Sequence, residues 1–111
     1  MADIKKKFGV RLFQLRSKAG MTQDQLAEKA NLSIDSIRRI ENGSRSPSFD
    51  SLERIADALG VDLVELFKFE GKEYKMLADA SPEVIKLWEL LKGKKRDKIK
   101  KIYDLAKIVL E

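Results

Sequence analysis

The chain has 111 residues, of which 43% are apolar and 37% charged, and its net charge is +5. This is enough apolar material for one packed domain with an appended segment. There is no cysteine and no histidine, which excludes disulfides, thiolate metal sites and the commonest general base and metal ligand. Only carboxylate or lysine chemistry remains, so we expect no enzyme, no metal and no cofactor.

No apolar run approaches the roughly 18 residues of a membrane span, and the N-terminal stretch lacks an apolar signal core. We expect a cytoplasmic protein without membrane contact.

The positive charge is unevenly distributed. Residues 1–67 carry 11 Lys/Arg and 10 Asp/Glu, a net of +1, whereas residues 68–111 carry 12 and 8, a net of +4. A basic balance favours an anionic partner, although charge by itself does not decide the function.

The predicted elements are all helices, and the first extends from about residue 4 to 18. Phe8, Leu12 and Leu15 recur at the spacing of one helical face. Ala19-Gly20 ends this helix.

A second and a third helix follow in close succession. Thr22 is a good N-cap, and Gln25 three residues later completes a capping-box pattern. Asn31 is a plausible left-handed stop, and Ser33 caps a third helix over residues 34–41. The connection between the two helices is only three residues long, so they must cross steeply.

Two further helices complete the predicted domain of residues 1–67. Ser48 opens the fourth, which Gly60 ends, and Asp62 caps a short fifth helix. The predicted inner face of the fourth helix comprises Phe49, Leu52, Ile55, Ala56 and Leu59.

The rest of the chain divides into two parts. Residues 68–80 have a weak, alternating pattern, which fits either a linker or a small hairpin around Glu70-Gly71. Ser81-Pro82-Glu83 is a strong helix start, and residues 81–111 are predicted to form a helical hairpin with more apolar surface than a short tail can hide. The residues expected to dimerise are Val84, Ile85, Trp88, Leu91, Ile99, Ile102, Ala106 and Val109.

Two features of this C-terminal segment have alternative interpretations. Trp88 could stack on a ligand, but its helical spacing with Ile85 and Leu91 favours a core or dimer interface. The run KGKKRDKIKK, residues 92–101, could contact nucleic acid, but lysines on an amphipathic helix more often form its solvated face.

The close pair of helices is typical of the helix-turn-helix of DNA-binding proteins. The segments LRSKAGMTQDQLAEKA (15–30), LSIDSIRRIENGSRSPS (32–48) and LERIADALGVDLVELF (52–67) resemble the phage-repressor, or Xre-type, helix-turn-helix family. The resemblance covers residues 8–67, a little over half of the chain. It implies a five-helix, lambda-repressor-like DNA-binding domain.

The resemblance also implies roles for individual residues. Gln23 matches a position that binds backbone phosphate in the family, and the helix end at Thr22 would assist it. Ser33 and Ser36 would lie near phosphate or base edges, and Ser44 and Arg45 would contact phosphate from the following loop. The exposed start and outer face of the reading helix would comprise Ile34, Asp35, Arg38 and Arg39.

The chemistry of these side chains suits the reading of bases, because arginine can grip guanine O6 and N7, aspartate can accept from cytosine N4, and Ile34 can touch a thymine methyl group. Ile34 and Asp35 depart from the family pattern, in which polar uncharged or basic residues are frequent. Asp35 either contacts a base or forms an intrahelical ion pair with Arg38 or Arg39. Arg16 and Glu41 match a partly buried structural ion pair of the family.

We therefore expect a transcriptional regulator, a repressor that binds double-stranded DNA as a homodimer on a palindromic operator. The alternative is a helix-turn-helix adaptor or antitoxin whose main role is to bind a partner protein. The near-neutral charge of residues 1–67 favours this alternative.

Overall fold

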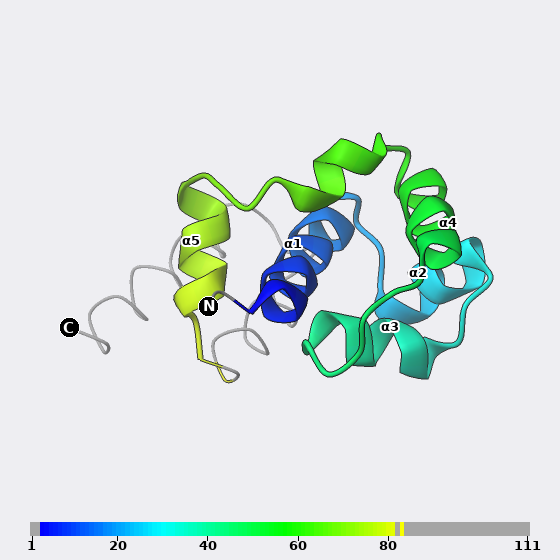
Figure 1. Cartoon of the computed structure of the whole chain (residues 1–111), viewed down its shortest axis with the longest axis horizontal. Coiled ribbons are helices and arrows are strands. Elements are labelled where there is room, and N and C mark those ends of the chain that lie inside the picture. The colour runs from blue at the N-terminus through cyan, green and yellow to red at the C-terminus, as the bar shows by residue number, and fades with distance from the viewer. Residues whose placement is uncertain (1–2, 82, 84–111) are drawn as a thin grey trace. The chain divides into compact units, whose positions relative to one another are not determined.

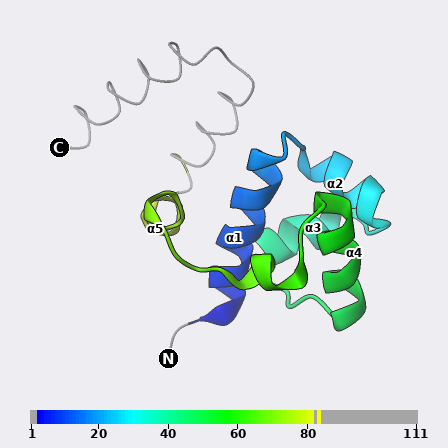
Figure 2. The ribbon, with the colours of Figure 1, turned by 90° about the horizontal axis from the view of Figure 1, so that it is seen from above.

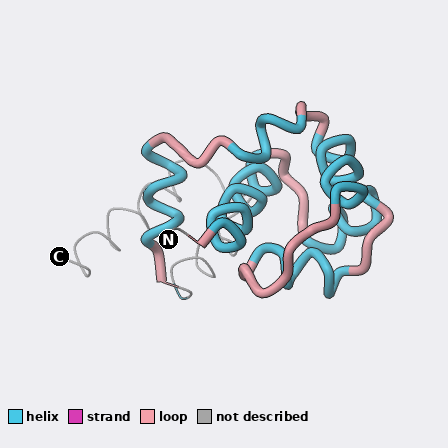
Figure 3. Tube along the Cα trace, in the orientation of Figure 1, coloured by secondary structure: helices cyan, strands magenta, loops and turns pink. Residues whose placement is uncertain are grey.

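The computed structural model of the protein describes residues 3–81 and 83, and every regular element in that part of the chain is a helix (Figures 1 and 3). The elements are α1 (Ile4–Lys18), α2 (Gln23–Ala30), α3 (Ile34–Glu41), α4 (Phe49–Leu59), the short 3-10 helix η1 (Leu63–Phe67) and α5 (Lys72–Asp79). The expected all-α class is confirmed. The predicted C-terminal hairpin and its dimerisation residues between 84 and 109 lie outside the described residues.

Helices α1 to α4 begin where side-chain caps satisfy free backbone N–H groups, whereas η1 and α5 have no side-chain cap, although Asp62 is predicted to cap η1. The hydroxyls of Thr22, Ser33 and Ser48 each accept a hydrogen bond from the backbone N–H three residues later, over 3.0 to 3.1 Å. The side chain of Gln25 returns a bond to the N–H of Thr22 at 2.9 Å, so the predicted capping box is present. Caps of this kind contribute about 1 kcal/mol each, which explains why local sequence located these helix starts.

The hydrophobic core joins α1, α2, α3, α4 and η1. Each of these elements contributes one side chain that is completely buried. They are Leu12, Leu26, Ile37, Ile55 and Leu66. Burial of a Leu or Ile side chain stabilises the fold by about 1.5–3 kcal/mol, so these contacts fix the mutual placement of the five elements. Among the described residues, no helix has the length and apolar character needed to cross a bilayer.

A glycine in the middle of α1 sets how closely that helix approaches α3. A Cβ atom placed on Gly9 would lie 2.3 Å from the carbonyl oxygen of Glu41 and 2.7 Å from that of Ile40. Only glycine permits this approach, because both neighbours are backbone atoms that cannot move aside. Figure 2 shows α1 passing beside one end of α3.

The linker or hairpin predicted for residues 68–80 is wrong, because the structure has the helix α5 there, packed against α1 (Figure 1). Tyr74 and Leu77 are buried, and the ring of Tyr74 stacks on Phe69 with centroids 5.9 Å apart. Gly71 precedes the helix at a φ of 99° and offers no side-chain cap. Local sequence therefore carries no start signal, and the first compact unit extends to Ala80 rather than ending at Phe67.

Phe49 is not on the inner face of α4, as its spacing with Leu52 and Ala56 predicts. Its side chain is 87% exposed. The buried side chains of α4 begin at Leu52. The first turn of the helix therefore extends beyond the core, although its periodicity places Phe49 on the inner face.

Candidate nucleic-acid interface

The turn between α2 and α3 holds the two helices in close contact. Asn31 adopts the left-handed conformation, with φ 55° and ψ 47°, and Leu32 donates its N–H to the carbonyl of Ala27 over 2.8 Å. Ala27 and Ala30 are buried, and their small side chains let α3 lie close to α2. The predicted tight turn is therefore present, and it fixes the direction in which α3 starts.

The outer face of α3 is open to solvent. Ile37 and Ile40 are buried and attach the helix to the core. Side chains two residues away from a buried position point to the opposite side of a helix, and Asp35, Arg38 and Arg39 are exposed there. At the start of the helix, Ile34 is also exposed. The described residues thus present α3 as a projecting helix whose outer face carries two cations.

Asp35 forms an ion pair with Arg39, one of the two interpretations that its sequence position allowed. Asp35 Oδ2 lies 2.9 Å from Arg39 Nε, while Oδ1 lies 4.0 Å from Arg38 Nη1. The three side chains are all more than half exposed, so each pair contributes at most about 1 kcal/mol to stability.

The loop after α3 brings a third cation to the same helix. Arg45 Nη1 donates a hydrogen bond to Ser36 Oγ over 3.0 Å, and Ser33 Oγ lies 2.9 Å from Ser36 Oγ. The backbone N–H groups of Ser44 and Arg45 donate to the carbonyl of Arg39 over 3.0 and 3.2 Å. The structure therefore brings Ser33, Ser36, Ser44 and Arg45 together at one side of α3.

The predicted ion pair between Arg16 and Glu41 is present and deeply buried. Arg16 Nε lies 2.6 Å from Glu41 Oε2, and Nη2 lies 3.0 Å from Oε1. The side chains are 1% and 7% exposed. Arg16 also donates to the carbonyl of Met21 over 2.9 Å and lies 5.2 Å from the ring centroid of Phe13, so the charge is well compensated.

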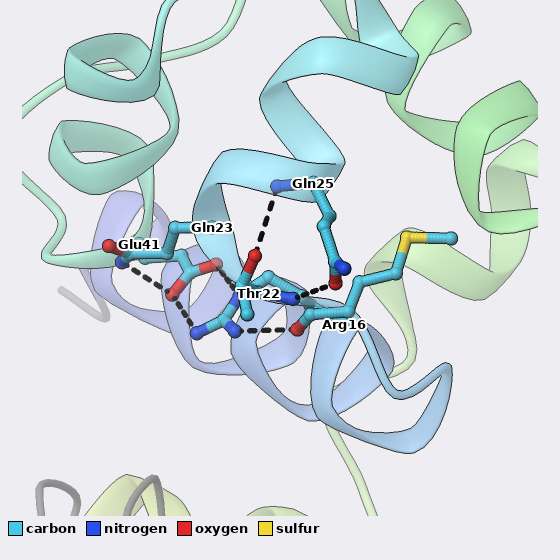
Figure 4. A network of polar contacts seen from close by, with 6 residues as sticks. Arg16, Thr22, Gln23, Gln25 and Glu41 are labelled. Atoms are coloured by element: carbon cyan, nitrogen blue, oxygen red, sulfur yellow. Dashed lines mark hydrogen bonds and ion pairs between the residues drawn. The ribbon is translucent and has the colours of Figure 1, made fainter.

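Gln23 joins this buried pair, a contact that the sequence did not predict. Its Nε2 donates to Glu41 Oε1 over 3.1 Å, and Figure 4 shows the amide and Arg16 converging on the same carboxylate beside the Thr22–Gln25 cap. A glutamine amide has two N–H donors and one acceptor oxygen. Gln23 is half-buried, so the bond to Glu41 orients the amide while its second N–H can donate to a phosphate.

Sequence reasoning missed two further features that position the interface. Gly9 sets the spacing between α1 and α3, and the signal for it is an isolated glycine inside a helical pattern. Arg54 Nη1 donates to the carbonyl of Asn31 over 3.3 Å, which ties α4 to the turn between α2 and α3. No local sequence signal connects these two residues, which are 23 positions apart.

The arrangement suits an anionic ligand rather than a metal ion. Within the described part of the chain, His, Cys, Asp and Glu form no group of three or more that could hold a metal. Three arginines, a cluster of hydroxyls and the N-termini of α2 and α3 can instead donate hydrogen bonds to phosphate and to base edges.

Comparison with known proteins identifies the family. A sequence model of the helix-turn-helix family matches residues 12–66. Control protein C.MunI from Mycoplasma sp is 40% identical over 74 residues, which cover 66% of this chain and 100% of that protein. The chain belongs to the helix-turn-helix family of DNA-binding transcriptional regulators.

Other helix-turn-helix proteins resemble this one over the same region. The immunity repressor of Bacillus phage phi105 is 35% identical over 89 residues, covering 70% of this chain and 62% of the repressor. The crystal structure of the restriction-modification controller protein C.AhdI from Aeromonas hydrophila superposes with a TM-score of 0.58 at 33% identity, covering 60% of this chain and 100% of that one. The predicted family and its DNA-binding class are therefore confirmed.

Proposed function

We propose that this helix-turn-helix regulator is a repressor that binds a palindromic operator as a homodimer. The observation that carries the proposal is the outer face of α3, where Arg38 and Arg39 are exposed and Arg45 adjoins them through Ser36. A helix with this face uncovered can enter the major groove, which is about 12 Å wide.

The residues divide into two kinds of contact. Gln23, Ser33 and Arg45 surround the reading helix and would bind phosphate, which sets register without reading sequence. Thr22, Ser36 and Ser44 would add hydroxyl or backbone donors beside them. Arg39 and Arg38 would read bases, with Ile34 positioned for a thymine methyl group.

A homodimer is supported by the small size of the reading module. One helix contacts only a few base pairs, whereas two modules on half-sites about 34 Å apart read twice as many. The apolar residues expected to dimerise between positions 84 and 109 would supply the dimerisation segment. A palindromic operator follows because two-fold symmetry in the protein requires it in the DNA.

Repression would follow from occupancy of the operator, in line with the phage immunity repressor among its relatives. A repressor of this kind would act in the cytoplasm, would not be an enzyme and would need no cofactor. In vitro transcription from an operator-containing template tests the direction of regulation, and we expect transcript to decrease as protein is added. An increase would identify an activator.

The second candidate is an adaptor or antitoxin that binds a partner protein. The net charge of only +1 over residues 1–67 favours it, because non-specific DNA affinity rises with positive charge. Copurification of a stoichiometric protein partner, with no retention on DNA at low salt, would select this candidate.

The division between base and phosphate contacts can be tested with two arginine variants. Selection of bound fragments from random DNA first provides the operator. Arg39→Ala should then lose about 1–3 kcal/mol of binding free energy on the operator and little on scrambled DNA. Arg45→Ala should weaken binding to both DNAs equally. It should also reduce the slope of log affinity against log salt concentration by about one.

Fluorescence anisotropy at two salt concentrations measures both effects. Lys75→Ala is the matched control, because Lys75 is an exposed cation on α5, away from α2, α3 and the loop that follows α3. Equal losses on operator and scrambled DNA for Arg39→Ala would contradict the assignment of Arg39 to bases.

A further inference from the structure

The ion pair on the outer face of α3 uses one particular edge of the arginine. Asp35 Oδ2 lies 2.9 Å from Nε of Arg39, the nitrogen nearest the main chain. A guanidinium is planar and carries five N–H donors in a fixed fork. Because this ion pair is on the Nε side of the guanidinium, the terminal Nη1 and Nη2 form the outer edge of the fork, and the structure gives neither of them a partner among the described residues.

The neighbouring arginine is held differently. Arg38 approaches the same carboxylate only through Nη1, at 4.0 Å, which is too long for a hydrogen bond. Arg38 and Arg39 are equally exposed, at 58% and 59%. Asp35 therefore orients the plane of Arg39 and leaves Arg38 without that constraint.

We propose that Asp35 is a positioning residue that aims Arg39 at a guanine, so that each operator half-site carries a guanine read through O6 and N7. This inference rests on the proposed function and adds the identity of the base. Two parallel N–H donors of a guanidinium match the two acceptors of guanine in the major groove. A guanidinium held in advance loses less conformational freedom when it forms these bonds.

Asp35 should also lower the affinity of the interface for DNA that lacks the guanine. A carboxylate on the outer face of α3 repels phosphate, and the cation nearest to it is Arg39, at 2.9 Å. On DNA that lacks the guanine, Arg39 cannot form the two hydrogen bonds, while the carboxylate of Asp35 still repels the phosphates. Removing Asp35 should therefore raise affinity for scrambled DNA while lowering discrimination.

The experiment uses the full chain and the operator selected with it. Each guanine of a half-site is replaced in turn by 7-deazaguanine, which lacks N7. In the wild-type protein, one replacement should weaken binding about tenfold, and Arg39→Ala should abolish the sensitivity at that position. Asp35→Ala should reduce the tenfold penalty to about threefold or less, and Asp35→Glu, which keeps a carboxylate at the i, i+4 spacing to Arg39, should restore most of it.

Asp50→Ala provides the matched control. Asp50 pairs with Arg54 at the same i, i+4 spacing and at 3.0 Å, but on α4 and through Nη2. Its removal should leave the guanine penalty unchanged. Circular dichroism and thermal melting verify that all variants are folded.

Three results would overturn the inference. The first is a base other than guanine at the Arg39-sensitive position. The second is an Asp35→Ala protein that keeps the full tenfold penalty and binds every DNA more tightly, which would make the ion pair a surface feature only. The third is a wild-type protein that selects no sequence, which would refute the proposed function and the inference together, whereas the first two results refute the inference alone.

Discussion

Glu41 is the residue on which the geometry of the interface most depends, through its carboxylate. It accepts two hydrogen bonds from Arg16 and one from Gln23, so it joins the end of α3 to α1 and to the start of α2. Its negative charge lies beside a surface proposed to meet phosphate, and the buried Arg16 offsets that charge.

Glu41→Ala should lower the free energy of unfolding by about 3–5 kcal/mol, because it leaves the guanidinium of Arg16 buried without its carboxylate. Denaturant unfolding measures the change. Asp50→Ala is the control, since its ion pair with Arg54 is exposed and its loss should cost at most about 1 kcal/mol. Similar values for the two variants would show that burial of the Arg16–Glu41 pair has no energetic consequence.

Among the elements, α5 docks on α1. Tyr74 stacks on Phe69, and its hydroxyl lies 3.5 Å from the carbonyl of Lys7 on α1. Burial raises the pKa of Tyr74 above its usual value of 10.0. The docked helix therefore favours the neutral phenol. Its contribution to stability is complete below pH 10 and is lost as the pH rises through the raised pKa.

The titration of Tyr74 reports this docking. The chain has two tyrosines, so Tyr103→Phe leaves Tyr74 as the only phenol seen by absorbance at 295 nm. We expect its midpoint above pH 10. In the same background, Leu77→Ala removes a buried contact of α5 and should return the midpoint toward 10. A midpoint of 10 before that substitution would mean that α5 does not dock in solution.

At the scale of the whole molecule, the proposed homodimer depends on residues beyond the described domain. Leu91→Asp places a charge at a predicted dimerisation position. We expect it to convert a dimer into a monomer in sedimentation at tens of micromolar, and to weaken operator binding because the two half-sites are then bound independently.

Val64→Asp is the control for this prediction. Val64 is an exposed apolar residue of η1, so the substitution leaves the core intact. We expect the dimer to persist. Dissociation of the Val64→Asp protein, with Leu91→Asp still dimeric, would move the interface from the C-terminal segment to η1.

Local sequence determined the helices that have strong caps and the family to which the chain belongs. Thr22 with Gln25, Ser33 and Ser48 locate helix starts because the capping partner is only three residues away. The Arg16–Glu41 pair could be identified because the family resemblance supplied a partner 25 positions along the chain.

Only the tertiary structure decided the rest, because the contacts involved join residues distant in sequence or depend on where a helix meets the core. Helix α5 lacks a cap and forms by packing Tyr74 and Leu77 against α1. Phe49 has the periodicity of a core residue but lies before the first buried turn of α4. Gln23 donates to Glu41, and Asp35 lies nearer to Arg39 than to Arg38. Both contacts depend on side-chain rotamers, which the spacing along a helix restricts but does not determine.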